Sequence, residues 1–146
     1  MKIITAQSLY YSWSGFTIIN LVSAILITGG NRDVNLKSAE IYLPSSNASC
    51  SLPELPEGRA RHTQDGPWTC GGDRENGTGT TCDQWSEGSW TRSHSLSGGR
   101  GGHVSWATGS GLYLIGGGYS GNTSELVKKD GSVEEGFKLK HTTEYW

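Results

Sequence analysis

The sequence predicts an all-β fold built from repeated units of short antiparallel strands, and three observations lead to that prediction. Glycine accounts for 22 of the 146 residues, about twice its usual share in globular proteins. Clusters of Gly, Ser, Asn and Asp, which are typical of turns, separate short apolar or strand-like runs. Three sequence markers also recur with a spacing of 41 to 45 residues, which indicates an internal structural repeat.

The first marker is a pair of adjacent glycines that ends an apolar or strand-like run. The pairs are Gly29-Gly30, Gly71-Gly72 and Gly116-Gly117, at spacings of 42 and 45 residues. Glycine suits a strand end where the backbone adopts positive φ or where another segment approaches closely. We therefore expect each pair to have a structural role in the repeat.

The second marker is a leucine followed by an arginine and a histidine at fixed intervals. Leu55-x3-Arg59-x2-His62 recurs as Leu96-x3-Arg100-x2-His103, with every member shifted by 41 residues. A catalytic residue is normally singular, whereas a repeated residue usually serves the repeat. We therefore expect His62 and His103 to form hydrogen bonds with a neighbouring strand or loop rather than to act as general bases.

The third marker is a carboxylate after each glycine pair, namely Glu40, Asp83 and Glu125. We expect these carboxylates to pair with backbone N–H groups or with an arginine, and the candidate partners are Arg59, Arg61 and Arg100. The two histidines outside the repeat, His94 and His141, are expected to be exposed.

The period leaves room for four short strands in each unit. In the last unit, the strands are expected at residues 102–107, 112–116, 123–128 and 136–140. A four-stranded unit of this length is a propeller blade. We expect blades at about 25–58, 59–98 and 99–141, about two of them complete and one partial, after an N-terminal segment 1–24 of uncertain structure.

Two or three blades are fewer than the roughly four to eight that close a propeller. The expected structure is therefore an incomplete propeller. We expect a fragment of a longer propeller; the alternatives are that several copies assemble through open blade edges or that the chain forms an open stack with exposed edges.

These residues resemble the kelch repeat. The motif consists of four apolar positions followed by Gly-Gly, then a Tyr or Trp 12–13 residues later, and then a further Trp. It is best seen in 25–42 and in Cys70, Trp85 and Trp90. The resemblance covers about residues 25–140. Two units depart from the kelch pattern. In the first unit, Leu52 or Pro53 stands at the position that Trp90 occupies in the second unit, and in the third unit Val127 stands in place of the Tyr. The alternative, a WD-repeat blade, lacks its Gly-His and Trp-Asp signatures here.

The resemblance implies a binding module without catalytic residues, cofactor or metal, whose partner is a protein or a glycan. The candidate binding loops follow the glycine pairs, at 31–37, 73–80 and 118–123. Two alternatives stay open. One is part of a galactose-oxidase-like copper enzyme, although no residue here matches its ligand set. The other is an intracellular kelch adaptor.

The odd number of cysteines leaves one thiol unpaired or means that its partner is missing from this chain. Cys70 and Cys82 flank a Gly-rich loop that can bring two strands within bridging distance, with Cys50–Cys70 as the second choice. Their spacing does not fit a zinc site. Free buried thiols are the alternative to any disulfide.

The expected location is extracellular, with the cytoplasm as the alternative. Three glycosylation sequons begin at Asn47, Asn76 and Asn122, all in loop-like sequence. Residues 16–28 are either the apolar region of a secretory signal or buried strands. The sequence contains no run of about 18 apolar residues, so a membrane-spanning helix is not expected. The net charge of −2 argues against nucleic-acid binding.

Overall fold

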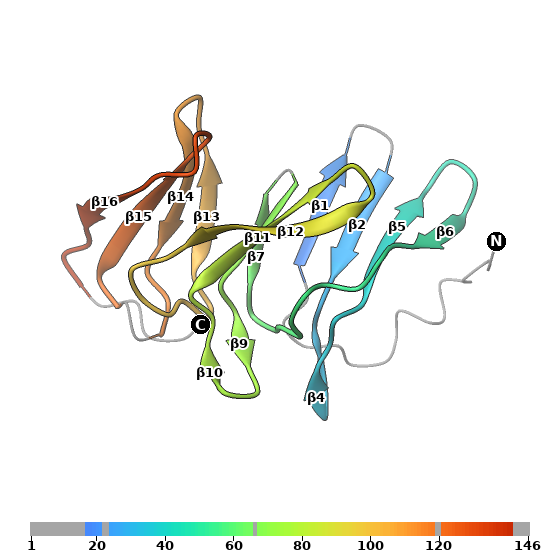
Figure 1. Cartoon of the computed structure of the whole chain (residues 1–146), viewed down its shortest axis with the longest axis horizontal. Helices are drawn as coiled ribbons and strands as arrows, with labels where there is room; N and C mark the ends of the chain where they lie inside the picture. Colours follow the sequence, from blue (N-terminus) through green and yellow to red (C-terminus); the bar gives the residue numbers. More distant parts are fainter. Residues whose placement is uncertain (1–16, 22–23, 66, 119–120, 142–146) are drawn as a thin grey trace.

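The computed structural model describes residues 17–21, 24–65, 67–118 and 121–141, and these residues form three four-stranded antiparallel sheets (Figure 1). Blade 1 contains β1 (Thr17–Leu21), β2 (Ala24–Thr28), β5 (Ala39–Leu43) and β6 (Ala48–Ser51). Blade 2 contains β7 (Thr63–Asp65), β8 (Trp68–Cys70), β11 (Thr81–Ser86) and β12 (Ser89–Ser95). Blade 3 contains β13 (Val104–Ala107), β14 (Gly111–Ile115), β15 (Thr123–Lys128) and β16 (Val133–Lys138).

Two small hairpins extend from blades 1 and 2, between the second and third strands of each sheet. They are β3 (Asn31–Arg32) with β4 (Val34–Asn35), and β9 (Asp73–Arg74) with β10 (Gly77–Thr78). Both hairpins follow a glycine pair, and both point toward the same edge of the molecule in Figure 1. We call this edge, where the hairpins and the connections between blades meet, the loop face.

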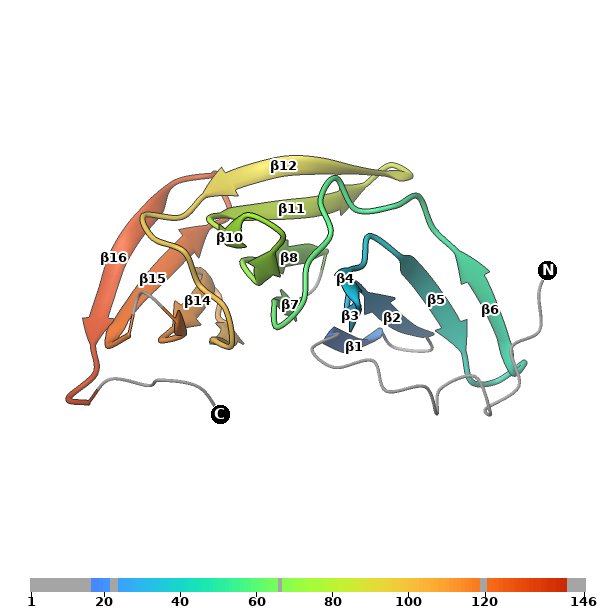
Figure 2. The ribbon, with the colours of Figure 1, turned by 90° about the horizontal axis from the view of Figure 1, so that it is seen from below.

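The three blades stand side by side in an open arc (Figure 2). The first strands, β1, β7 and β13, lie on the inner side of the arc, and the last strands, β6, β12 and β16, lie on the outer side. Strand β7 contacts both β1 and β13. The fold is thus all-β, with several antiparallel sheets of which none is closed, as expected for an incomplete propeller.

Each blade has two faces because side chains alternate along a strand. We call the face turned toward the preceding blade in sequence the leading face, and the opposite one the trailing face. In blade 3, Leu112 and Leu114 are buried on the leading face, whereas Tyr113 and Ile115 point to the trailing face and stay half-buried.

Two apolar clusters fill the spaces between blades. Between blades 1 and 2, Leu26 and Ala39 pack against Leu55 and Trp90. Between blades 2 and 3, the cluster consists of Cys70, Cys82, Leu96, Leu112, Leu114 and Val127. The core of the protein therefore lies between sheets and not within one of them.

The structure corrects the expected number of complete blades, since all three sheets have four strands. The first sheet is completed by β1, which lies in the N-terminal segment 1–24. Strands β1 and β2 pair in register from Thr17↔Thr28 to Leu21↔Ala24. The apolar run at 16–28 therefore supplies two strands of blade 1; residues 16, 22 and 23 lie outside the described residues. In blade 3, the last strand begins at Val133, three residues before the expected start.

Candidate functional site

The repeated spacing of leucine, arginine and histidine corresponds to one repeated structural element. We call residues 55–62 and 96–103 the Leu–Arg–His segments; each leads from one blade into the next. Gly30 N donates a hydrogen bond to Arg59 O at 2.9 Å, and Gly72 N donates one to Arg100 O at 2.7 Å. Each segment therefore holds the glycine pair of the preceding blade.

The close approach explains the first glycine of each pair. Gly29 and Gly71 have φ of +60° and +64°, a region that residues with a side chain rarely adopt. A Cβ atom on Gly71 would lie 2.8 Å from Cε1 of His103, and one on Gly29 would lie equally close to His62. Glycine is required at both positions on conformational and steric grounds.

Each histidine of a Leu–Arg–His segment contacts a threonine of the preceding blade. His62 Nε2 lies 2.9 Å from Thr28 Oγ1, and His103 Nε2 lies 2.7 Å from Thr63 Oγ1. The Thr28 hydroxyl donates its one proton to Gln64, so it accepts a hydrogen bond from N–H at Nε2 of His62.

Both histidines are neutral at physiological pH. Burial is the main cause that lowers the pKa of each to about 3, and the charges of Arg59 and Arg100 act in the same direction. A group with so low a pKa is a poor general base near neutral pH. The two histidines are placed to hold neighbouring blades together.

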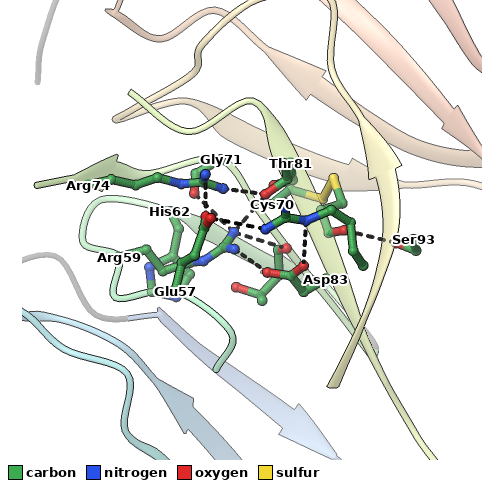
Figure 3. A network of polar contacts seen from close by, with 12 residues as sticks. Glu57, Arg59, His62, Cys70, Gly71, Arg74, Thr81, Asp83 and Ser93 are labelled. Atoms are coloured by element: carbon green, nitrogen blue, oxygen red, sulfur yellow. Dashed lines mark hydrogen bonds and ion pairs between the residues drawn. A yellow bond between two sulfur atoms is a disulfide. The ribbon is translucent and has the colours of Figure 1, made fainter. Parts of the chain in front are cut away.

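Arg59 crosses the junction between blades 1 and 2 as a fully buried cation (Figure 3). Its guanidinium forms an ion pair with Asp83, and Nη1 donates to the carbonyl oxygen of Gly71 at 3.1 Å. Weaker contacts reach the carbonyls of Thr69 and Thr81 at 3.4 and 3.3 Å. Burial lowers the pKa of Arg59 to about 10, which leaves it charged at neutral pH.

Arg100 has the same role at the junction between blades 2 and 3. Its Nε donates to Glu125 Oε1 at 3.0 Å, and Nη1 donates to the carbonyls of Gly116 and Thr123 at 2.8 and 3.0 Å. The second carboxylate oxygen of Glu125 accepts a hydrogen bond from Ser97 N at 2.8 Å. The buried pair is thus saturated with hydrogen bonds, as a buried ion pair requires.

The remaining members of the expected arginine–carboxylate set behave differently. Arg61 pairs with Asp73, near the surface of the loop face. Glu40 is half-buried on the leading face of blade 1 and has no arginine partner among the described residues. The structure therefore completes the arginine–carboxylate contact in blades 2 and 3 only.

The expectation that His94 is exposed is wrong, because its side chain is buried. His94 stands opposite Cys82 in the sheet, and opposite residues share a face. It therefore lies on the trailing face of blade 2, which blade 3 covers. There its Nε2 is 3.1 Å from Lys128 O, and its ring meets Trp68 edge to face. His141 is exposed, as expected.

The expected disulfide between Cys70 and Cys82 is confirmed. The two residues are direct cross-strand neighbours with Cα atoms 4.1 Å apart, and both are fully buried on the trailing face of blade 2. Cys50 is free and exposed.

The two tryptophans of the repeat lie at the junction between blades 1 and 2. Trp85 and Trp90 are cross-strand neighbours with ring centroids 5.2 Å apart. Trp90 packs against Leu26 and Leu55, and its Nε1 donates to Pro53 O at 3.0 Å. These rings fill the space between the two blades.

A hollow of about 360 Å³ opens on the loop face between the β3–β4 and β9–β10 hairpins. It is lined by Asn35, Lys37, Glu57, Gly58, Arg74, Glu75, Asn76, Gly77 and Thr78. Asn35 and Lys37 come from the first candidate loop, and residues 74–78 come from the second. Of the third loop, 118–123, residues 119 and 120 lie outside the described residues.

The walls of the hollow are held by short polar contacts. Asn35 Nδ2 donates to Asp73 O at 3.1 Å and so joins the two hairpins. Glu57 pairs with Arg74 and, at 3.2 Å, with Arg92. A Cβ atom on Gly58 would collide with the backbone of Asn35. Sequence reasoning missed Glu57 and Gly58, although Gly58 directly precedes the repeated arginine.

The three sequons differ in their surroundings. Asn47 is exposed in the turn between β5 and β6, and Tyr42 donates a hydrogen bond to its side chain. Asn76 is exposed at the tip of the β9–β10 hairpin and lines the hollow. Asn122 is half-buried immediately before β15.

Among the described residues, no group of three His, Cys, Asp or Glu side chains is arranged to hold a metal ion. The same residues include no helix long and apolar enough to cross a membrane.

Comparison with known proteins identifies the fold alone. No protein-family model and no curated protein matches the chain. Among solved structures, one titled "Structure of YjhT" is similar, with a TM-score of 0.74 and 14% sequence identity. The similarity covers 88% of this chain and 53% of that chain, so this chain spans about half the length of that protein.

Proposed function

We propose that this chain is a non-catalytic kelch-type propeller segment that binds a glycan or a polar protein segment at its loop face. The observation that carries the proposal is the hollow between the two hairpins that follow the first two glycine pairs. Loops held by a rigid repeat scaffold are common places for binding sites.

The lining of the hollow suits a ligand rich in hydroxyl or amide groups. Hydrogen-bond donors and acceptors are supplied by Asn35, Lys37, Asn76 and Thr78. The opposite charges of Glu57 and Arg74 compensate each other, so the hollow has no strong preference for one sign of charge. Polar and uncharged groups are therefore the best matched ligands.

The cysteine chemistry supports an extracellular location for this module. The disulfide between Cys70 and Cys82 is fully buried, and disulfides of this kind persist in oxidising compartments. An intracellular adaptor would keep both thiols reduced. The exposed sequon at Asn47, which lies outside the hollow, is compatible with the same location.

The proposal is tested by NMR titration of the intact chain with a panel of defined neutral and acidic oligosaccharides. A binding sugar should shift the amide signals of residues 31–37 and 73–78. Lys37→Ala should weaken binding about fivefold, equivalent to about 1 kcal/mol. The matched control is Lys129→Ala, an exposed lysine in the turn between β15 and β16, which should leave affinity unchanged.

A protein ligand is tested in parallel by selecting a displayed peptide library on the wild-type chain. Selected peptides should lose binding to a Lys37→Ala/Thr78→Val variant that melts like the wild type. Sugars or peptides that bind elsewhere, with no response from the hairpins, would contradict the proposal.

A further inference from the structure

Blade 3 exposes an apolar trailing face. Val104, Trp106 and Phe137 are 65%, 61% and 47% exposed. Cross-strand register places Val104 beside Ile115 and Trp106 beside Tyr113. The rings form a continuous row, with centroids 6.0 Å apart between Trp106 and Tyr113 and 6.1 Å apart between Tyr113 and Phe137. An exposed apolar patch of this kind marks an interaction surface.

The equivalent positions in the other two blades are covered. Counted back from each glycine pair, Ile115 corresponds to Thr28 of blade 1 and Cys70 of blade 2. Thr28 and Cys70 are fully buried against the next blade. The trailing face of a blade is therefore an interface wherever a following blade is present.

The other end of the arc presents the matching kind of surface. On the leading face of blade 1, Ile25 and Ile27 occupy the positions of Leu112 and Leu114, counted from the glycine pair. In blade 3 those two leucines cover the trailing face of blade 2. Ile25 and Ile27 are half-buried, so the same aliphatic pattern is available at the first blade.

We propose that the trailing face of blade 3 docks on the leading face of blade 1 in a second copy of this chain. The contact repeats at both ends of the arc, so that two copies close one ring. The arc of Figure 2 is open on one side. A head-to-tail contact that closes in this way limits assembly to two copies.

Glu40 would place a carboxylate without an arginine partner in this interface. It stands beside Ile27 on the leading face of blade 1, and the corresponding carboxylates of blades 2 and 3 are each paired with a buried arginine. Docking would remove water from Glu40 without supplying an arginine, which is costly for a charged group. Glu40→Gln should therefore tighten the association.

The experiment is sedimentation equilibrium of the full chain over a range of concentrations. All variants carry Cys50→Ser, because the free exposed thiol can form an intermolecular disulfide. The background protein should sediment at twice the 15.7 kDa chain mass. Val104→Lys and Trp106→Glu should raise the dissociation constant at least about tenfold, and Glu40→Gln should lower it.

The matched control is Val34→Lys, since Val34 is a valine with 53% exposure on the β3–β4 hairpin, away from both end faces. It should associate like the background protein. A monomer at concentrations up to about 100 µM would overturn the proposal. A dimer whose dissociation constant is unchanged by Val104→Lys and Trp106→Glu would also overturn it, as would an open-ended series of larger species.

Discussion

The two junctions between blades use the same Leu–Arg–His segment but surround it with different side chains. At the first junction, Asp83 pairs with Arg59 and also lies 3.6 Å from Arg92. At the second, Glu125 pairs with Arg100 and accepts one further hydrogen bond, from Ser97 N. The two segments therefore make the same backbone contacts with the glycine pairs, whereas the partners of the buried carboxylate differ between the junctions.

The apolar parts of the junctions differ as well. Two tryptophan rings fill the first junction, Trp85 and Trp90. The second contains mainly aliphatic side chains and the buried disulfide of Cys70 and Cys82, with Trp68 packed against them. Similar geometry is thus reached with different core chemistry, which shows that the position of the segment does not depend on one particular core.

The largest expected effect is the loss of a buried arginine. Arg100→Met leaves Glu125 buried without a cation and should lower the free energy of unfolding by about 3–5 kcal/mol. Arg59→Met should cost less, since Asp83 keeps Arg92 nearby. Urea denaturation of both variants measures the difference. Equal losses would mean that the exposed Arg92 gives Asp83 no support.

The next effect concerns the glycine pairs. Gly71→Ala places a methyl group against Arg100 O and His103 at positive φ and should cost about 3 kcal/mol. Gly72→Val should be destabilising for the same reasons, with φ of +92° and His62 Cβ at 2.8 Å. Gly109→Ala is the control, because no atom lies within 4 Å of its Cβ position. Wild-type melting temperatures for Gly71→Ala and Gly72→Val would disprove the close approach.

The disulfide should stabilise the second junction selectively. The double variant Cys70→Ala/Cys82→Ala opens a loop with a sequence separation of 12 residues and should cost about 2–3 kcal/mol. Hydrogen exchange should accelerate first in blade 3 and in the trailing face of blade 2. Acceleration that is uniform over all three blades would show that the junctions are not independent.

The smallest effect is the response to mild acid. His62 and His103 have a pKa of about 3 when folded, against about 6.5 when unfolded. Below pH 6.5 the unfolded state therefore binds more protons, and stability falls as the pH falls toward 3. Each histidine should cost about 1 kcal/mol by pH 5.5. Thermal melts between pH 7.5 and 5.5 test this, and His62→Gln should reduce the pH dependence by about half.

Much of this architecture could be predicted because its key contacts repeat. The glycine pairs and the spacing of Arg59 and Arg100 are visible as a period, and in the structure they meet in one repeated element. The cross-strand position of Cys70 and Cys82 followed from the loop between them. Residue types that recur at a fixed spacing can be recognised in a single sequence.

Other features depended on contacts that have no period. The first strand, β1, lies in an apolar run that is also compatible with a secretory signal. His94 is buried because blade 3 covers the face of strand β12 on which its side chain lies. Arg61 forms its ion pair with Asp73 on the loop face. The hollow depends on the meeting of two hairpins 38 residues apart, through Asn35 and Asp73. None of these contacts leaves a local signal in the sequence.

The central claim is that each Leu–Arg–His segment joins two blades through the glycine pair of the preceding one. Hydrogen exchange of the Gly30 and Gly72 amides measured by NMR tests it most directly. Both amides donate to the carbonyl of a segment arginine, so they should exchange as slowly as the central strands. Exchange as fast as that of the exposed Gly109 would contradict the claim.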